Sequence, residues 1–178
     1  MLRTLDSGET WTEQTSATMK TLNDIFMSNP NTGTVVGDSG VILHTTNGGM
    51  TWNAQESTVP SHLQGVYFID VNTGTAVGDW GTILHTTDGG NTWKVQYSNW
   101  PTRQLRSVYL TSATRGHVVG QGIILRTTDG GENWTTQGTD ISYLYKVSFF
   151  DSINGIAVGD FGNISQTTNG GETWSPFG

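Results

Sequence analysis

An eight-residue box that returns five times at nearly constant spacing limits what this chain can fold into. Each box ends in a tryptophan, and successive tryptophans are 41, 41, 41 and 40 residues apart. The third position is always Asp or Asn: Asp6, Asn47, Asp88, Asp129 and Asn169. The closing residues are Trp11, Trp52, Trp93, Trp134 and Trp174. A fixed period of about 40 residues is typical of architectures in which each copy forms one structural unit.

Each period has the local pattern of four short β-strands, which we name A to D. In the second full copy, strand A covers 63–69 and is rich in β-branched and aromatic residues, B covers 75–78, C covers 82–86, and D opens at Trp93. Four short antiparallel strands per repeat predict an all-β chain, a β-propeller of four-stranded antiparallel blades. Residues 1–4 match the end of a strand C, so we expect four full repeats plus an N-terminal half blade. Residues 1–178 would then be a single propeller domain or part of one.

The chemistry of the box predicts a structural role. Asp or Asn can accept hydrogen bonds from backbone N–H groups within the turn, and the fifth-position Gly permits positive φ. The tryptophan is expected to pack between adjacent sheets. Because Asn replaces Asp in two of the five copies, the carboxylate charge is not needed, and we expect no catalytic or metal-binding role.

Other recurrent polar residues receive the same interpretation. Asp38, Asp79 and Asp160 recur at the B–C turn, where the third copy has Gln121, and we assign them to the turn. His44 and His85 occupy equivalent strand-C positions, but other copies carry Arg or Gln there, so we expect no metal site. No cofactor is expected either.

Composition excludes several classes of function. The chain has 8 Lys and Arg against 15 Asp and Glu, a net charge of −7, which argues against nucleic acid as a partner. It has no cysteine, which excludes disulfides and thiolate chemistry. No stretch approaches the roughly 20 apolar residues of a membrane-spanning helix, so no membrane insertion is expected. The first residues lack the pattern of a signal peptide.

Boxes of the TTDGGxTW kind, preceded by a Val-Gly-Asp-x-Gly-x-Ile-Leu run, resemble Asp-box (bacterial neuraminidase-type, BNR) repeats, most of all the photosystem II stability/assembly-factor-like branch. The resemblance covers essentially the whole chain. It implies a β-propeller in a family that includes a non-enzymatic binding protein, and it favours an extracellular, cell-surface or periplasmic location. More distant Asp-box relatives include sialidases and xyloglucan-cleaving enzymes. Arg103, Arg106 and Arg115 all fall within one repeat, so they cannot form the arginine cluster of a sialidase drawn from several blades, and we predict no catalytic residue.

Variable residues at equivalent positions mark the candidate binding surface. Strand directions place the D–A loops and B–C turns on one face, the top, and the A–B turns and Asp boxes on the bottom. The starts of the A strands line the channel and carry Asn23, Asp24, Gln64, Arg106, Tyr145 and Lys146. The top loops and turns add Trp80, Tyr97, Trp100, Arg103 and Phe161. Exposed aromatics beside Arg suit protein binding or stacking on sugars, although Trp80 and Trp100 could instead cover the edges of neighbouring blades.

We therefore predict a non-catalytic propeller module that binds a protein or other macromolecule through its top face. The alternatives are a glycan-binding, lectin-like module or a remnant of an Asp-box glycoside hydrolase, and a structural assembly subunit. The leading half blade favours a piece of a larger ring, or a ring completed by a partner chain or by a homo-oligomer, over a small ring of four to five blades.

Overall fold

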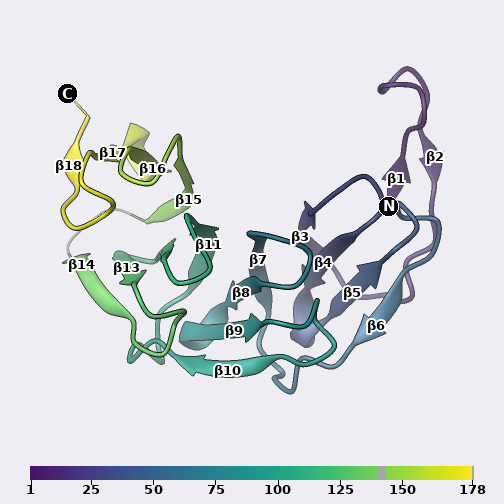
Figure 1. Cartoon of the computed structure of the whole chain (residues 1–178), viewed down its shortest axis with the longest axis horizontal. Coiled ribbons are helices and arrows are strands. Elements are labelled where there is room, and N and C mark those ends of the chain that lie inside the picture. Colours follow the sequence, from purple (N-terminus) through teal and green to yellow (C-terminus); the bar gives the residue numbers. More distant parts are fainter. Residues whose placement is uncertain (140–142, 178) are drawn as a thin grey trace.

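The computed structural model describes residues 1–139 and 143–177, which form five antiparallel sheets (Figure 1). Blade 1 contains β3 (Leu22–Met27), β4 (Gly33–Gly37), β5 (Ile42–Thr45) and β6 (Asn53–Gln55); blade 2 contains β7 (Leu63–Phe68), β8 (Gly74–Gly78), β9 (Thr82–Thr86) and β10 (Lys94–Tyr97). Blade 3 contains β11 (Leu105–Leu110), β12 (Gly116–Gly120), β13 (Ile123–Thr127) and β14 (Thr135–Thr139); blade 4 contains β15 (Leu144–Phe149), β16 (Gly155–Gly159), β17 (Ile164–Thr167) and β18 (Ser175–Pro176). A two-stranded half blade of β1 (Leu2–Arg3) and β2 (Thr12–Glu13) precedes them. The predicted four repeats and half blade are confirmed.

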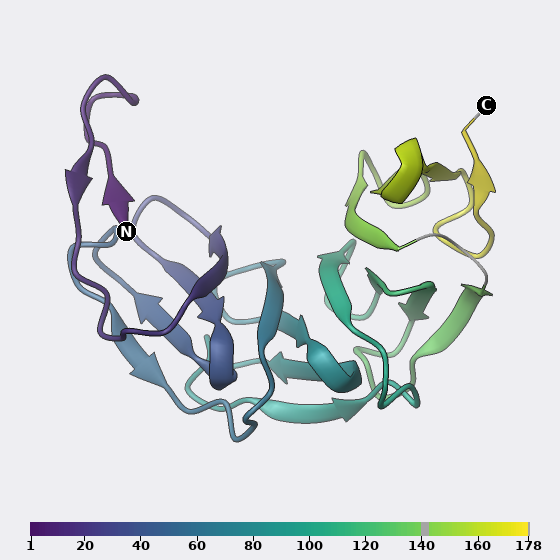
Figure 2. The same cartoon turned by 180° about the vertical axis from the view of Figure 1, so that it is seen from behind.

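The blades form an open arc with the chain termini at its two ends (Figures 1 and 2). The A strands β3, β7, β11 and β15 line the inner side, and the D strands β6, β10, β14 and β18 lie on the outside. The small closed ring is therefore not the arrangement seen. In the described ranges, no helix is long and apolar enough to cross a membrane.

Apolar side chains join each blade to the next. Val77 and Ile83 of blade 2 pack against Leu105 and Val108 of blade 3, and the same positions recur at the junctions on either side. An aromatic ladder runs along the inner strands, with Tyr67 4.5 Å from Tyr109 between ring centroids. Burial of apolar surface between neighbouring sheets contributes about 25 cal/mol per Å², which favours the stacking of one blade on the next.

The Asp boxes have the expected hydrogen bonds. Oδ1 of Asp88 accepts a bond from the backbone N–H of Thr92 at 2.9 Å, and Oδ1 of Asn169 makes the equivalent bond at 3.1 Å. Gly90 has φ of 86°, the conformation that favours glycine.

Most box tryptophans pack between sheets, as predicted, but Trp11 does not. Trp52, Trp93 and Trp134 are buried and Trp174 is half-buried, whereas Trp11 is 57% exposed. The prediction was wrong for Trp11, which lines an open cavity beside blade 1 and donates from Nε1 to the Gly8 carbonyl of its own box at 3.1 Å.

Candidate functional site

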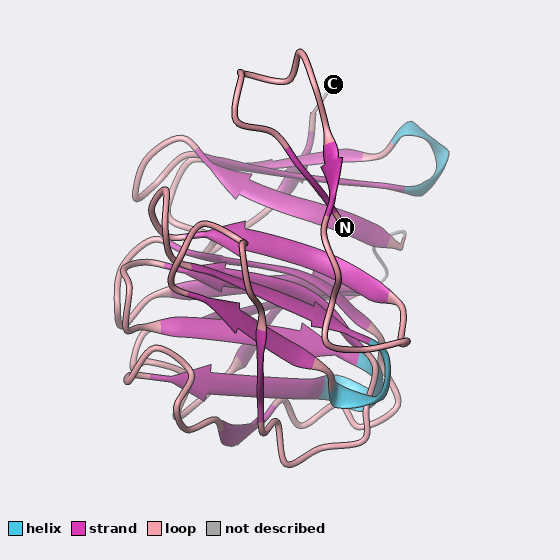
Figure 3. Ribbon diagram, turned by 90° about the vertical axis from the view of Figure 1, so that its right-hand side faces the viewer, coloured by secondary structure: helices cyan, strands magenta, loops and turns pink. Residues whose placement is uncertain are grey.

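Backbone hydrogen bonds place the connecting loops at two opposite ends of the blades. The B–C turns bond to the ends of the D–A loops, as in the bond from Asp79 N to His62 O at 2.9 Å. The Asp boxes bond to the A–B turns, as in the bond from Gly89 N to Asn72 O at 2.9 Å. Figure 3 shows the three B–C 3₁₀ turns (Asp38–Gly40, Asp79–Gly81 and Asp160–Gly162) gathered at one end. The loops and turns predicted to form the top face thus share one end of the blades.

The structure brings the predicted channel residues together in one concavity. A hollow of about 390 Å³, which we call the inner hollow, lies at the top end of the A strands. Its lining consists of Asn23, Asp24, Gln64, Arg106, Tyr145 and Lys146. All four full blades contribute to it, because these residues occupy the second and third positions of β3, β7, β11 and β15.

The turn aspartates hold three of these residues in place. Asp38 Oδ1 accepts a bond from Asn23 Nδ2 at 3.0 Å, and Asp79 Oδ1 accepts one from Gln64 Nε2 at 3.3 Å. In blade 4, the Tyr145 hydroxyl donates to Asp160 Oδ1 at 2.6 Å. The bond from Asn23 lowers the pKa of Asp38, and the bond to Asp160 raises the pKa of Tyr145. These aspartates therefore do more than shape a turn, because each one positions a residue of the inner hollow.

Blade 3 departs from this pattern at Arg106. Its B–C turn carries Gln121 where the other blades have Asp. Arg106 Nη1 donates to Gln64 Oε1 at 3.1 Å, Nη2 to Gln104 Oε1 at 3.3 Å, and Nε to the Tyr143 hydroxyl at 2.9 Å. Two amide oxygens and a hydroxyl orient the Arg106 side chain. No carboxylate among the described residues lies within ion-pair distance of its guanidinium.

The other charged residues of the inner hollow differ in their contacts. Asp24 Oδ2 accepts a bond from Val66 N at 2.9 Å, which ties blade 1 to blade 2. Lys146 is exposed. Sequence reasoning missed Gln104 and Tyr143, which lie at the ends of variable loops. Arg106 itself was predicted from the sequence, and its repeat is also the one in which Gln121 replaces the Asp of the B–C turn.

The remaining predicted residues lie outside the inner hollow. Trp100 packs against the core between blades 2 and 3 and donates from Nε1 to Thr136 Oγ1 at 3.0 Å. Arg103 lies over the Trp100 ring, 5.9 Å from its centroid, and donates to the Gln121 carbonyl at 3.1 Å. Trp80 and Phe161 are 65% and 100% exposed. Tyr97 belongs to β10, but its side chain lies outside the described residues.

The box residues and the strand-C histidines form no site at the top end. Across the described residues, no group of three or more His, Asp or Glu could hold a metal ion. His44 and His85 instead lie beside Thr34 and Thr75, with Nδ1 3.1 Å from each hydroxyl.

Comparison with known proteins identifies similar propellers. Residues 52–143 match the family described as photosynthesis system II assembly factor YCF48. A structure of YCF48 bound to D1 peptide matches with a TM-score of 0.74 and 26% identity, covering 90% of this chain and 54% of that one. YCF48 from Cyanidioschyzon merolae matches with a TM-score of 0.75 and 24% identity, covering 93% of this chain and 59% of that one. The chain thus spans little more than half the length of these two relatives.

Glycoside hydrolases of the GH74 type share the fold at lower identity. The enzyme from Niastella koreensis matches with a TM-score of 0.71 and 15% identity, covering 87% of this chain and 30% of that one. No curated protein matches the chain.

Proposed function

The chain belongs to the photosystem II assembly factor YCF48 family, and we propose that it is a non-catalytic module that binds a peptide segment of a partner protein. The proposed site is the inner hollow. A YCF48 structure 26% identical to this chain holds a D1 peptide, which supports a peptide as the kind of ligand. No catalytic residue is assigned, and the binding is proposed to be the function.

The observation that carries this proposal is the Arg106 side chain. Its three donor nitrogens are fixed by Gln64, Gln104 and Tyr143, none of which carries a negative charge at neutral pH. Fixing the guanidinium in advance lowers the entropy cost of binding, and a carboxylate ligand forms short charge-assisted bonds with it. Lys146 adds a second positive charge to the lining of the same hollow. We therefore propose that the bound segment presents a carboxylate to Arg106.

Calorimetric titration of the full chain with the D1 peptide tests this function. We expect saturable binding that weakens by tenfold or more in Arg106→Gln, because a charge-assisted bond to a carboxylate contributes about 1.5–3 kcal/mol. Arg103→Gln is the matched control, since it removes the same charge outside the hollow, and it should bind within about twofold of the parent chain.

If Arg106→Gln and Arg103→Gln weakened peptide binding equally, the peptide would not be bound in the inner hollow, and the proposed site would be wrong. A chain that binds β-glucan or sialylated glycans and no peptide would instead identify the glycan-binding alternative. Release of sugar from those substrates would overturn the non-catalytic assignment.

A further inference from the structure

Trp80 is a large aromatic side chain that stays mostly uncovered in the middle of the arc. It is 65% exposed, although blade 2 packs against a full blade on each side. Trp100, from the loop that follows blade 2, does cover a junction, because it packs against the core between blades 2 and 3. The two tryptophans therefore differ in role, and packing between blades does not account for Trp80.

The backbone of the B–C turn is unfavourable for a bulky residue at this position. Trp80 has φ of 57°, in the left-handed region that favours glycine. Ser39 occupies the same position in blade 1 with the same φ, so the turn itself does not need an aromatic ring. A strained residue whose side chain is not explained by packing points to a functional role.

Hydrogen bonds hold this turn against the loops that lead into β7 and β11. Asp79 N donates to the His62 carbonyl at 2.9 Å, and Gly81 N donates to the Arg103 carbonyl at 2.7 Å. The turn also contacts β11, the strand that carries Arg106. The backbone under Trp80 is therefore fixed before a ligand arrives, which lowers the entropy cost of using this residue as a contact.

One side chain, Gln64, connects the turn to the inner hollow. Its Nε2 donates to Asp79 Oδ1 at 3.3 Å, and its Oε1 accepts a bond from Arg106 Nη1 at 3.1 Å. Trp80 follows Asp79 directly in the chain. An extended segment of about three to five residues is therefore long enough to contact both Trp80 and Arg106.

We propose that the segment bound in the inner hollow also places an apolar side chain on Trp80, within about five residues of the carboxylate that binds Arg106. This inference rests on the function proposed above and names the kind of segment, one with an acidic group and an apolar group close together. The exposed indole ring is a large apolar surface, and its burial favours an apolar partner. Tryptophan and arginine are also enriched among the residues that dominate the binding energy of interfaces.

The test is calorimetric titration of the full chain and of its Trp80→Ser variant with the same D1 peptide. Blade 1 carries serine at this turn position, so the variant should keep the fold, with a urea midpoint no lower than that of the parent chain. We expect the affinity for the peptide to fall roughly tenfold or more, because the ring supplies the apolar part of the contact.

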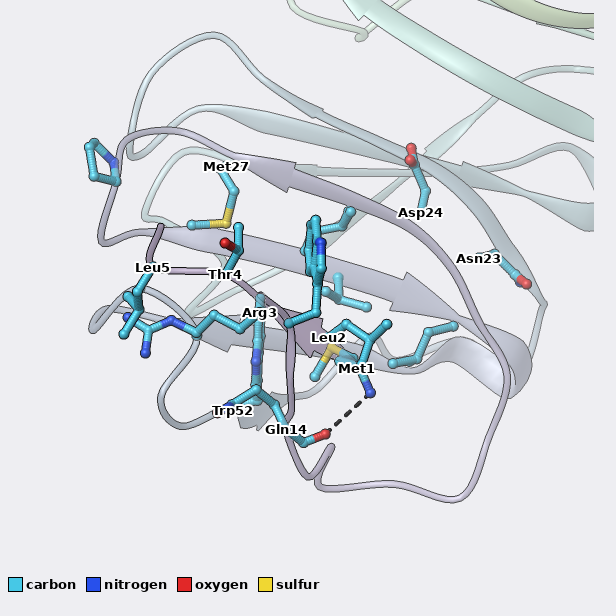
Figure 4. A pocket seen from close by; sticks show the side chains of 17 residues that line it. Met1, Leu2, Arg3, Thr4, Leu5, Gln14, Asn23, Asp24, Met27 and Trp52 are labelled. Carbon is cyan, nitrogen blue, oxygen red and sulfur yellow. Dashed lines mark hydrogen bonds between the residues drawn. The ribbon is translucent and has the colours of Figure 1, made fainter. Parts of the chain in front are cut away.

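Leu2→Ser is the matched control. It removes a side chain that is 66% exposed and that lines the cavity of about 540 Å³ beside blade 1 (Figure 4). Only Asn23 and Asp24 line both that cavity and the inner hollow, and Figure 4 shows these two side chains away from Leu2. The control should bind the peptide within about twofold of the parent chain.

Alanine replacement along the peptide identifies the group that meets Trp80. One apolar position should lose about as much affinity as Trp80→Ser causes. That loss should largely disappear when the altered peptide is titrated into Trp80→Ser, because two groups in contact are not additive. Coupling of Trp80 to a Lys or Arg of the peptide, or to no position at all, would overturn the proposal.

The remaining outcomes separate this inference from the proposed function. Peptide binding that Arg106→Gln weakens and Trp80→Ser does not would overturn the inference and leave the proposed function standing. A greater loss with Leu2→Ser than with Trp80→Ser would place the apolar contact in the cavity beside blade 1 instead. A lower urea midpoint for Trp80→Ser would assign the ring to stability. No binding of the peptide to the parent chain would overturn both proposals.

Discussion

On the outer strands β6 and β10, a single glutamine joins its blade to the next one. Gln96 Oε1 accepts a bond from Trp134 Nε1 at 3.2 Å, while Gln96 Nε2 donates to the Gly130 carbonyl at 2.8 Å. Gln55 makes the same two bonds one blade earlier. Each glutamine thus accepts a hydrogen bond from the tryptophan of the next Asp box and donates one to a carbonyl in the turn of the same box.

The junction between blades 3 and 4 lacks this pair of glutamine hydrogen bonds. A β-bulge between β13 and β14 skips Gln137, whose amide instead bonds to Thr135 Oγ1 at 2.9 Å. His117 and Arg126 take over the contact with the Gly170 carbonyl, at 3.0 and 2.9 Å. Trp174 Nε1 is buried and has no hydrogen-bond partner among the described residues. One inserted residue therefore changes how two blades are held together.

The two tryptophans should respond differently to replacement by phenylalanine. Trp134→Phe removes a hydrogen bond and leaves Gln96 Oε1 without its donor, whereas Trp174→Phe removes an unpaired N–H group. We expect Trp134→Phe to lower the free energy of unfolding by about 1 kcal/mol more than Trp174→Phe does. Urea unfolding followed by far-ultraviolet circular dichroism measures this difference. Equal losses in the two variants would mean that the glutamine bond contributes nothing to stability.

His117 predicts a pH dependence of stability. Burial lowers its pKa from 6.5 to about 4, and its Nε2 lies 3.0 Å from the Gly170 carbonyl. The unfolded chain therefore binds a proton at His117 below pH 6.5, while the folded chain stays neutral there. The contribution is fully present above pH 6.5 and is lost as the pH falls from 6.5 towards 4, by ~3 kcal/mol at most.

The His117→Gln variant isolates this effect. Urea midpoints between pH 7.5 and pH 4 should fall less steeply in the variant than in the parent chain. Part of the slope should remain, because burial also lowers the pKa of His44 and of His85. A parent and variant with the same slope would show that His117 does not titrate as its burial predicts.

At the scale of elements, the repeat predicts the strands well but not the exceptions to it. Box spacing located all four strands of each blade, because short runs of apolar, β-branched and aromatic residues recur at the same distance from the box in every copy. The bulge at Gln137 depends on pairing register, and nothing in the residue types of 135–139 reveals it. The hollow was predicted from strand starts such as Gln64 and Arg106. Gln104 and Tyr143 were missed because their positions depend on loops without a repeated pattern.

The B–C turns place large side chains in the left-handed region. Trp80 and Phe161 have φ of 57° and 56°, and Ser39 occupies the same position in blade 1. Bulky residues disfavour this region, by roughly 1–2 kcal/mol relative to glycine. Phe161 is fully exposed, so no packing within the chain offsets that cost.

Replacing Phe161 should therefore stabilise the fold. Phe161→Gly is expected to raise the free energy of unfolding by about 0.5–1 kcal/mol, because relief of strain exceeds the added entropy of the unfolded chain. Phe161→Ala is the matched control, since it removes the ring and keeps the Cβ atom that causes the strain. Urea unfolding should show a gain for Gly and little change for Ala. A gain of equal size in both variants would assign the effect to the ring instead.

At the scale of the whole molecule, the arc is a linear stack in which each blade contacts only its neighbours. In such arrays, stability is close to a sum of blade terms and junction terms. Blades 2 and 3 have a junction on both faces. Blade 4 has one, and its other face leaves Val158 and Ile164 38% and 40% exposed, where Val77 and Ile83 are fully buried. The stability of the molecule should therefore be distributed unevenly along the chain.

Native-state hydrogen exchange should reveal this gradient. We expect the slowest amides in β8 and β12, the buried B strands of blades 2 and 3, and the fastest in β1, β2, β17 and β18. Local opening of an end blade breaks one junction, whereas opening of a middle blade breaks two. Leu105→Ala, in the junction between blades 2 and 3, should speed exchange in both β8 and β12 while leaving β17 nearly unchanged. Uniform protection across all four blades, or equal acceleration everywhere in Leu105→Ala, would instead show that the arc unfolds as one cooperative unit.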